Sequence, residues 1–175
     1  MKYLIIFLSG FFLLLFTSCE DEVQPIEVEW TKEQSTDLNK ELAIQEELDI
    51  RFYLEMHKDW KMRKTGSGLQ LYIYKEGEVD ASFHPQSGHI AMIEYKITLL
   101  DGTVCDETKE DEYVDFKVDN SEIESGVQEA IKLLSLGDHA KLIIPSHLAH
   151  GLIGDLDKIP PLTTLVMDIH LIGVR

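Results

Sequence analysis

Two histidines near the C-terminal end of the chain are the first residues that could do chemistry. His147 and His150 stand three residues apart in the stretch IPSHLAHG, which begins at Ile144. Imidazoles at this spacing can bind a metal ion, act as a general base with its partner, or line a binding pocket. A structural zinc ion usually takes four Cys or His ligands, and Cys105 is far away in sequence. The pattern therefore favours a site without metal.

The charge of the chain limits the partners that it can have. Sixteen basic and 32 acidic residues give a net charge of −16 over 175 residues. Such a surface repels phosphate backbones and anionic lipid head groups, so we expect no nucleic-acid partner and no electrostatic membrane binding. The hydrophobic share of 44% is ordinary for a globular protein. The composition therefore predicts one domain with accessory segments.

The N-terminal segment resembles a secretory signal that ends at a lipid-attachment cysteine. Lys2 precedes an apolar run from Leu4 to Phe16, which is shorter than the roughly 20 residues that span a bilayer. Small residues then lead to Cys19, as in a bacterial lipobox, where cleavage before the cysteine leaves it to carry the lipid. We expect a signal peptide over residues 1–18 and lipidation of Cys19. The alternative is a signal that is cleaved without lipidation.

The cysteine count agrees with a lipidated N-terminus. If Cys19 carries a lipid, Cys105 has no partner for an intramolecular disulfide, and the domain depends on its own core. The acidic residues after Cys19 form either a solvated linker or a tract that resembles the surface-export signal of lipoproteins in some gliding bacteria. Both alternatives make residues 19–34 an acidic tether. The expected location is the cell envelope, at the periplasmic face or the cell surface.

An amphipathic helix is predicted over residues 35–64. Its apolar residues recur at three-, four- or six-residue steps: Leu38, Leu42, Leu48, Phe52, Met56 and Trp60. Ser35 or Thr36 would cap its start. Three basic residues would suit the negative end of its dipole, namely Lys61, Arg63 and Lys64. We favour a helix that packs on its own domain over a spacer or dimerisation helix.

Beyond residue 68 the apolar residues alternate, which is typical of strands. The strand-like segments are LQLYIY, HIAMIEYKITLL, YVDFKVD, HAKLIIP and TTLVMDIHLIGV. Between the third and fourth of them, GVQEAIKLLSLGD predicts a short helix that ends at Gly137. Its buried face would hold Val127, Ala130, Ile131 and Leu134. One short helix among antiparallel strands predicts an α+β fold in which the sheet wraps that helix, preceded by the N-terminal helix.

Three blocks of sequence stand in order over residues 88–175: IEYKITLLDGTVCDET, SGVQEAIKLLSLGDHAKLIIPSHLAHG and KIPPLTTLVMDIHLIGV. Together they resemble an FKBP-type peptidyl-prolyl cis-trans isomerase. The resemblance implies an FKBP-like half-barrel over residues 88–175, with a strand and linker at 65–87. The preceding lipobox and helix resemble gliding-motility-associated isomerases of gliding bacteria. The family implies proline-containing polypeptides as clients, no cofactor and no metal.

The chemistry that the resemblance implies needs no nucleophile. An X–Pro bond isomerises slowly because the resonance of its amide must be broken. A catalyst must bind the twisted amide more tightly than either planar form, and a dry, apolar pocket favours the less polar twisted state. The implied activity is therefore prolyl isomerisation that assists the folding of secreted or envelope proteins.

The resemblance also assigns site residues by their positions. Tyr95 and Asp106 match the pocket tyrosine and aspartate of the family. His150 stands where a tyrosine usually donates a hydrogen bond to the substrate carbonyl, and we expect its ring N–H to take that role. His147 is expected to face water. Further substrate contacts are expected from Cys105, Phe116, Ile123, Val127, Ile159 and Met167.

Four positions lack the aromatic residue that the family usually has, which predicts a wider and softer pocket. They are Cys105, Val114, Val127 and Met167. Cys105 is expected to be a small buried hydrophobe, because no basic neighbour would lower the pKa of its thiol. Two functions stay open: an isomerase of weak but real activity, or a catalytically weakened FKBP-like binding or chaperone module of an envelope assembly that serves gliding or secretion.

Overall fold

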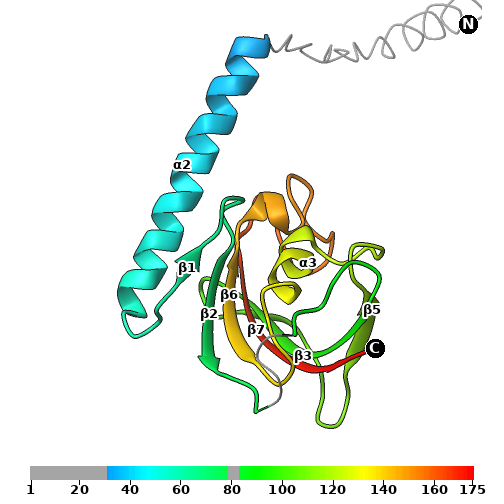
Figure 1. Ribbon diagram of the computed structural model, residues 1–175. Helices are drawn as coiled ribbons and strands as arrows, with labels where there is room; N and C mark the ends of the chain where they lie inside the picture. The colour runs from blue at the N-terminus through cyan, green and yellow to red at the C-terminus, as the bar shows by residue number, and fades with distance from the viewer. Residues whose placement is uncertain (1–30, 79–82) are drawn as a thin grey trace, which may run out of the picture. The chain divides into compact units, whose positions relative to one another are not determined.

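The computed structural model describes residues 31–78 and 83–175 (Figure 1). The chain divides into two compact units, residues 1–36 and 37–175. The predicted signal peptide, the lipidation site at Cys19 and most of the predicted tether lie outside the described residues. In the part of the chain that is described, no helix is long and apolar enough to span a bilayer.

Helix α2 comprises Lys32–Met56 and begins before the predicted position. The Oγ1 atom of Thr31 accepts a hydrogen bond from the backbone N of Gln34 at 3.2 Å. In return, Oε1 of Gln34 accepts one from the backbone N of Thr31 at 3.0 Å. This reciprocal capping box satisfies two N–H groups that the helix itself leaves free. The prediction of Ser35 or Thr36 as the cap was therefore wrong.

Packing around Trp60 explains why α2 ends at Met56 and not at residue 64. The ring of Trp60 lies 4.4 Å from that of His57 and 6.0 Å from that of Tyr53, between ring centroids. The chain has to turn back after the helix to bring these rings together. Arg63–Lys64 then form strand β1, paired with the next strand, and do not complement the helix dipole as predicted. Tertiary contacts here override helix propensity.

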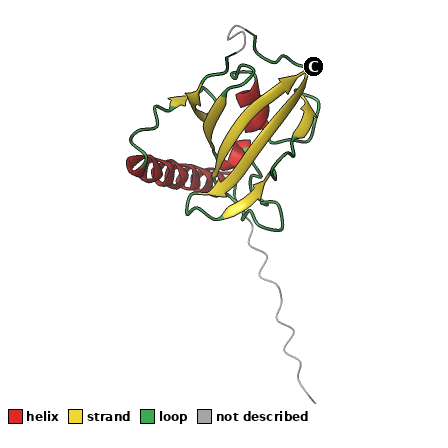
Figure 2. Ribbon diagram, turned by 90° about the horizontal axis from the view of Figure 1, so that it is seen from below, coloured by secondary structure: helices red, strands yellow, loops and turns green. Residues whose placement is uncertain are grey.

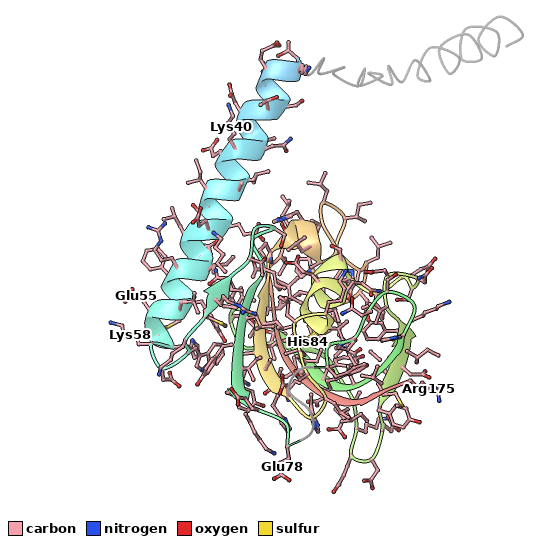
Figure 3. The ribbon with its side chains drawn as sticks, viewed as in Figure 1. Lys40, Glu55, Lys58, Glu78, His84 and Arg175 are labelled. Carbon is pink, nitrogen blue, oxygen red and sulfur yellow. The ribbon has the colours of Figure 1, made fainter. Side chains whose placement is uncertain are left out.

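The face with which α2 meets the domain differs from the predicted one. Ile50 is its buried residue, at 5% exposure. Three residues of the predicted apolar face are solvent-exposed: Leu38 at 43%, Phe52 at 69% and Met56 at 73%. Figure 3 shows Lys40 and Glu55 projecting from the helix into solvent. The helix contacts its own domain, but it buries fewer apolar residues than expected of the packed helix that we favoured.

A seven-stranded antiparallel sheet forms the body of the domain, in the order β1-β2-β6-β7-β3-β4, with β5 also paired to β3. After β1, its strands are β2 Gln70–Lys75, β3 Ile90–Leu99, β4 Val104–Glu107, β5 Val114–Lys117, β6 His139–Ile144 and β7 Leu165–Val174. The sheet curves around helix α3, Ser125–Ile131 (Figures 1 and 2). The predicted α+β architecture is confirmed.

Helix α3 fills the concave side of the sheet but is shorter than predicted. Val127, Ala130 and Ile131 are at most 1% exposed, as expected for its buried face. Leu134 is also fully buried, yet it lies beyond the last helical residue. Gly137 does not end the helix: with φ at +90°, it forms the turn before β6, where its N–H donates to the carbonyl of Leu171 at 2.8 Å. Gly137 therefore belongs to the turn before β6, and the helix ends earlier, at Ile131.

Candidate substrate-binding site

Tyr95 of β3 and Asp106 of β4 meet at one edge of the core. The burial pattern of β3 places Tyr95 on the inward face, and its ring packs against the hydrophobic core. The hydroxyl of Tyr95 donates a hydrogen bond to Oδ2 of Asp106 at 2.6 Å. A short bond to an ionised acceptor is among the stronger hydrogen bonds in proteins. The orientation of the tyrosine ring is therefore fixed from the neighbouring strand.

The environment of Tyr95 keeps its hydroxyl protonated. Burial, the hydrogen bond to Asp106 and the negative charges of Asp106 and Glu124 together raise the pKa of Tyr95 to about 12. Each of these influences opposes the phenolate and favours the neutral phenol. Tyr95 is thus an uncharged hydrogen-bond donor at any physiological pH.

Glu124 lies against the predicted site residue His150 and is not among the residues predicted from the sequence. It directly precedes α3, and its side chain makes no capping hydrogen bond to the helix. Instead, Oε1 of Glu124 lies 3.0 Å from Nε2 of His150, with the two side chains 18% and 27% exposed. An acidic residue before a helix has an ordinary explanation as a cap. Nothing local in the sequence pointed to its contact with the histidine of another loop.

The contact with Glu124 changes what His150 can donate. At 3.0 Å, the carboxylate of Glu124 can accept a hydrogen bond from Nε2 only when that nitrogen carries the proton. His147 is exposed, as expected, and its Nε2 lies 3.0 Å from the carbonyl oxygen of Ser67.

The remaining predicted contact residues differ in burial. One lies at the edge of the predicted pocket, here called the rim, and five lie beneath it, here called the floor. Ile123 is partly buried and packs at the edge of the core. The floor residues are buried members of the core cluster, between 1% and 6% exposed: Cys105, Phe116, Val127, Ile159 and Met167. Burial raises the pKa of the Cys105 thiol, as expected for a small hydrophobe. These five side chains are therefore covered and expose little surface to a substrate.

Hydrogen bonds within the loop that joins β6 to β7 shape the segment carrying His150 and Ile159. The carbonyl of Gly151 accepts a hydrogen bond from the N–H of Leu162 at 2.8 Å, which closes the loop on itself. Oδ1 of Asp155 accepts hydrogen bonds from the N–H groups of Asp157 and Ile159 at 2.9 and 2.7 Å. These N–H groups lower the pKa of Asp155. The loop is thus internally cross-linked.

The described part of the chain has two cavities of note, of which the second shares one residue with the predicted site. One of about 540 Å³ lies between α2 and the domain and is lined by Glu46, Leu99, Ser146 and other residues. The other, of about 470 Å³, runs along α3 and shares the rim residue Ile123. Neither of these two is lined by Tyr95. Among residues 31–78 and 83–175, no three His, Cys, Asp or Glu side chains are grouped so that they could hold a metal ion.

Known proteins share both the sequence and the fold of this domain. A profile of the FKBP-type peptidyl-prolyl cis-trans isomerase family matches residues 82–172, just over half of the chain. The probable FKBP-type isomerase FkpA of Neisseria meningitidis is 39% identical over 114 residues, which cover 65% of this chain and 40% of that protein. Outer membrane protein MIP of Legionella longbeachae is 36% identical over 110 residues, covering 62% of this chain and 45% of MIP.

A solved structure shows the same architecture. The crystal structure of FkpA from Escherichia coli superimposes with a TM-score of 0.65 at 27% identity, over 81% of this chain and 64% of that one. The chain spans about half the length of several curated relatives: 40% of the Neisseria FkpA, 56% of the Escherichia coli FkpA and 45% of MIP. The matched profile covers the strands and the loop that hold Tyr95, Asp106, Glu124 and His150. The chain belongs to the FKBP-type peptidyl-prolyl cis-trans isomerase family.

Proposed function

We propose that the chain is a peptidyl-prolyl cis-trans isomerase that assists the folding of secreted or envelope proteins. The observation that carries this proposal is the hydrogen bond of 2.6 Å between Tyr95 and Asp106. These two residues occupy the positions where the family resemblance expects the pocket tyrosine and aspartate. Family membership supports the reaction type, and the isomerase domain is proposed to occupy residues 88–175.

In the proposed mechanism, the site binds the X–Pro amide best when it is twisted. Asp106 fixes the ring of Tyr95 against the prolyl ring, and Ile123 supplies an apolar wall beside it. His150 donates to the carbonyl oxygen, which is no longer conjugated with nitrogen in the twisted state. Preference for the twisted amide by about 1.36 kcal/mol accelerates the reaction about tenfold, so a few such contacts suffice.

A second function, a binding module with weakened catalysis, has two observations in its favour. Val127 and Met167 stand where the family usually has aromatic residues, and both are closed off within the core at 1% and 2% exposure. His150, the proposed carbonyl donor, is already engaged by Glu124. In this alternative the domain holds an unfolded client or an envelope assembly without accelerating isomerisation.

Measuring the refolding of a reporter protein that is limited by proline isomerisation separates the two functions. The full chain, solubilised in mild non-ionic detergent, should accelerate the slow phase in proportion to its concentration. Its binding to a permanently unfolded, proline-containing polypeptide is measured in parallel. A slow phase identical to that in detergent alone, with binding retained, would reject the isomerase and select the binding module.

The N-terminal segment is proposed to anchor the protein in the cell envelope through a lipid on Cys19. The apolar run before Cys19 and the small residues that precede it support lipidation. The name of the MIP relative places that protein in an outer membrane, which favours the envelope for this chain as well. A periplasmic or surface position agrees equally with the acidic residues that follow the cysteine.

Substituting Cys19 with serine tests the anchor. Cells fed an alkyne-tagged fatty acid should label the unmodified chain and not Cys19→Ser, and the variant should leave the membrane fraction. Cys105→Ser is the matched control, because Cys105 is buried in the core and should not change the labelling. Equal labelling of the chain and of Cys19→Ser would refute the lipid on this residue.

A further inference from the structure

The carboxylate of Glu46, on α2, binds both ends of the loop that joins β6 to β7. Its Oε1 accepts hydrogen bonds from the backbone N–H of Ser146 at 2.6 Å and from the hydroxyl of Thr164 at 2.7 Å. Its Oε2 accepts a third from the hydroxyl of Ser146 at 3.2 Å. Ser146 and Thr164 are 5% and 3% exposed. One side chain of the N-terminal helix thus joins segments far apart in sequence.

Ser146 transmits this contact to the backbone on either side of His150. It begins the short helix η1, Ser146–Leu148, whose preceding residue, Pro145, supplies no capping side chain. The N–H groups at the start of a helix need an outside acceptor, and Glu46 provides one. The carbonyl of Ser146 in turn accepts hydrogen bonds from the N–H groups of Ala149 at 3.0 Å and Gly151 at 2.8 Å.

Apolar packing next to Glu46 is incomplete, so the contact between α2 and the domain depends more on the hydrogen bonds of Glu46. The cavity of about 540 Å³ between α2 and the domain lies at this point, and Glu46 lines it together with Leu42 and Leu99. Ile50 is the buried residue of the helix. Because few side chains close this contact, neighbouring packing cannot replace the three hydrogen bonds if they are lost.

We infer that Glu46 is a positioning residue, which holds His150 in place through Ser146 and fixes the far end of the same loop through Thr164. On this account α2 belongs to the catalytic unit and is not only a spacer. The kinetic part of the inference rests on the proposed isomerase function. The structural part, that Glu46 orders the loop, stands apart from any activity.

The kinetic test is Glu46→Gln, measured with a short prolyl peptide and the full chain in detergent. The variant turns a two-oxygen acceptor into a group with one acceptor and one donor, which faces the donors of Ser146 and Thr164. We expect kcat to fall about tenfold, with KM within twofold of the original value. Glu47→Gln is the matched control, since Glu47 pairs only with Lys64 at 3.4 Å on the surface, and it should leave both constants unchanged.

A double substitution separates positioning from general destabilisation. In a chain that already carries His150→Phe, Glu46→Gln should lower kcat by less than twofold, because both changes act on the same group. Additive losses would show that Glu46 does not act through His150. Thr164→Val, which removes one of the three hydrogen bonds, provides a milder variant if Glu46→Gln fails to fold.

Amide hydrogen exchange tests the structural part without any catalysis. The N–H groups of Ala149 and Gly151 should exchange at least tenfold faster in Glu46→Gln than in Glu47→Gln. Unchanged exchange would overturn the inference, whatever the activity. Faster exchange in a chain without isomerase activity would refute the proposed function and the kinetic role, and would leave Glu46 as the residue that orders the loop.

Discussion

Replacing Asp106 with alanine should lower kcat/KM for a prolyl peptide tenfold to a hundredfold. The hydroxyl of Tyr95 would lose its acceptor at 2.6 Å, and its ring would no longer be fixed against the substrate. A hydrogen bond to a charged group contributes about 1.5–3 kcal/mol, and about 1.36 kcal/mol corresponds to a tenfold change in rate. Initial isomerisation rates over a range of peptide concentrations measure the effect.

Glu107→Ala is the matched control for Asp106→Ala. Glu107 follows Asp106 on β4, and its carboxylate pairs with Lys96 at 2.5 Å, outside the proposed site. Its loss should leave kcat/KM unchanged. If Asp106→Ala is as active as the unmodified chain, the tyrosine–aspartate pair has no part in catalysis.

The hydrogen-bonded pair of Tyr95 and Asp106 also predicts how the activity of the unmodified chain and that of Asp106→Ala differ at alkaline pH. Since burial and Asp106 raise the pKa of Tyr95 to about 12, the neutral phenol should persist across the whole range from pH 7 to about 10. In Asp106→Ala the hydrogen bond and the nearby charge are gone, so the pKa of Tyr95 falls. Loss of activity through ionisation of Tyr95 should therefore begin at a lower pH in Asp106→Ala than in the unmodified chain.

Gly137→Ala should destabilise the domain by about 2–5 kcal/mol, from backbone strain and overpacking together. Gly137 has φ at +90°, and a Cβ added there would lie 2.9 Å from the Cα of Gly77. Neither backbone can yield cheaply, because the N–H of Gly137 bonds to Leu171 of β7 and the N–H of Gly77 bonds to Asp138. Equilibrium unfolding in urea measures the loss.

Two other glycines separate the causes of that loss. Gly102 also has a positive φ, +89°, but a Cβ there would meet nothing within 4 Å, so Gly102→Ala measures the backbone strain alone. Gly66 has open space and no such φ, and Gly66→Ala should change stability little. If Gly137→Ala loses no more stability than Gly102→Ala, the close approach of the turn to Gly77 contributes nothing to the loss.

The order of elements in the domain was predictable because alternation and helical spacing follow directly from which side chains are buried. The bounds of α2 were not. Trp60 continues the apolar spacing of the helix in sequence, yet its ring packs at a tilt against that of His57 after the chain has turned, so periodicity alone extended the helix too far. The cap at Thr31 was missed for a related reason, since several residues there can cap a helix and only the Thr31–Gln34 pair forms the reciprocal bonds.

The candidate site was predictable where its residues match family positions, and not where contacts join distant loops. Tyr95 and Asp106 lie together as their positions implied. The partner of His150 was not foreseen, because Glu124 is far from it in sequence and reads as a helix cap. Glu46 was missed for the same reason: the donors that its carboxylate accepts from belong to Ser146 and Thr164, which are far from it in sequence.

Exchange NMR of a proline-containing peptide tests the central claim most directly, because it reports the cis–trans rate at equilibrium without a coupled enzyme. With the full chain at a tenth of the peptide concentration, the exchange rate should rise clearly above the rate in detergent alone. With Asp106→Ala it should return most of the way to that background. An exchange rate that is the same with the unmodified chain, with Asp106→Ala and with detergent alone would contradict catalysis at this site.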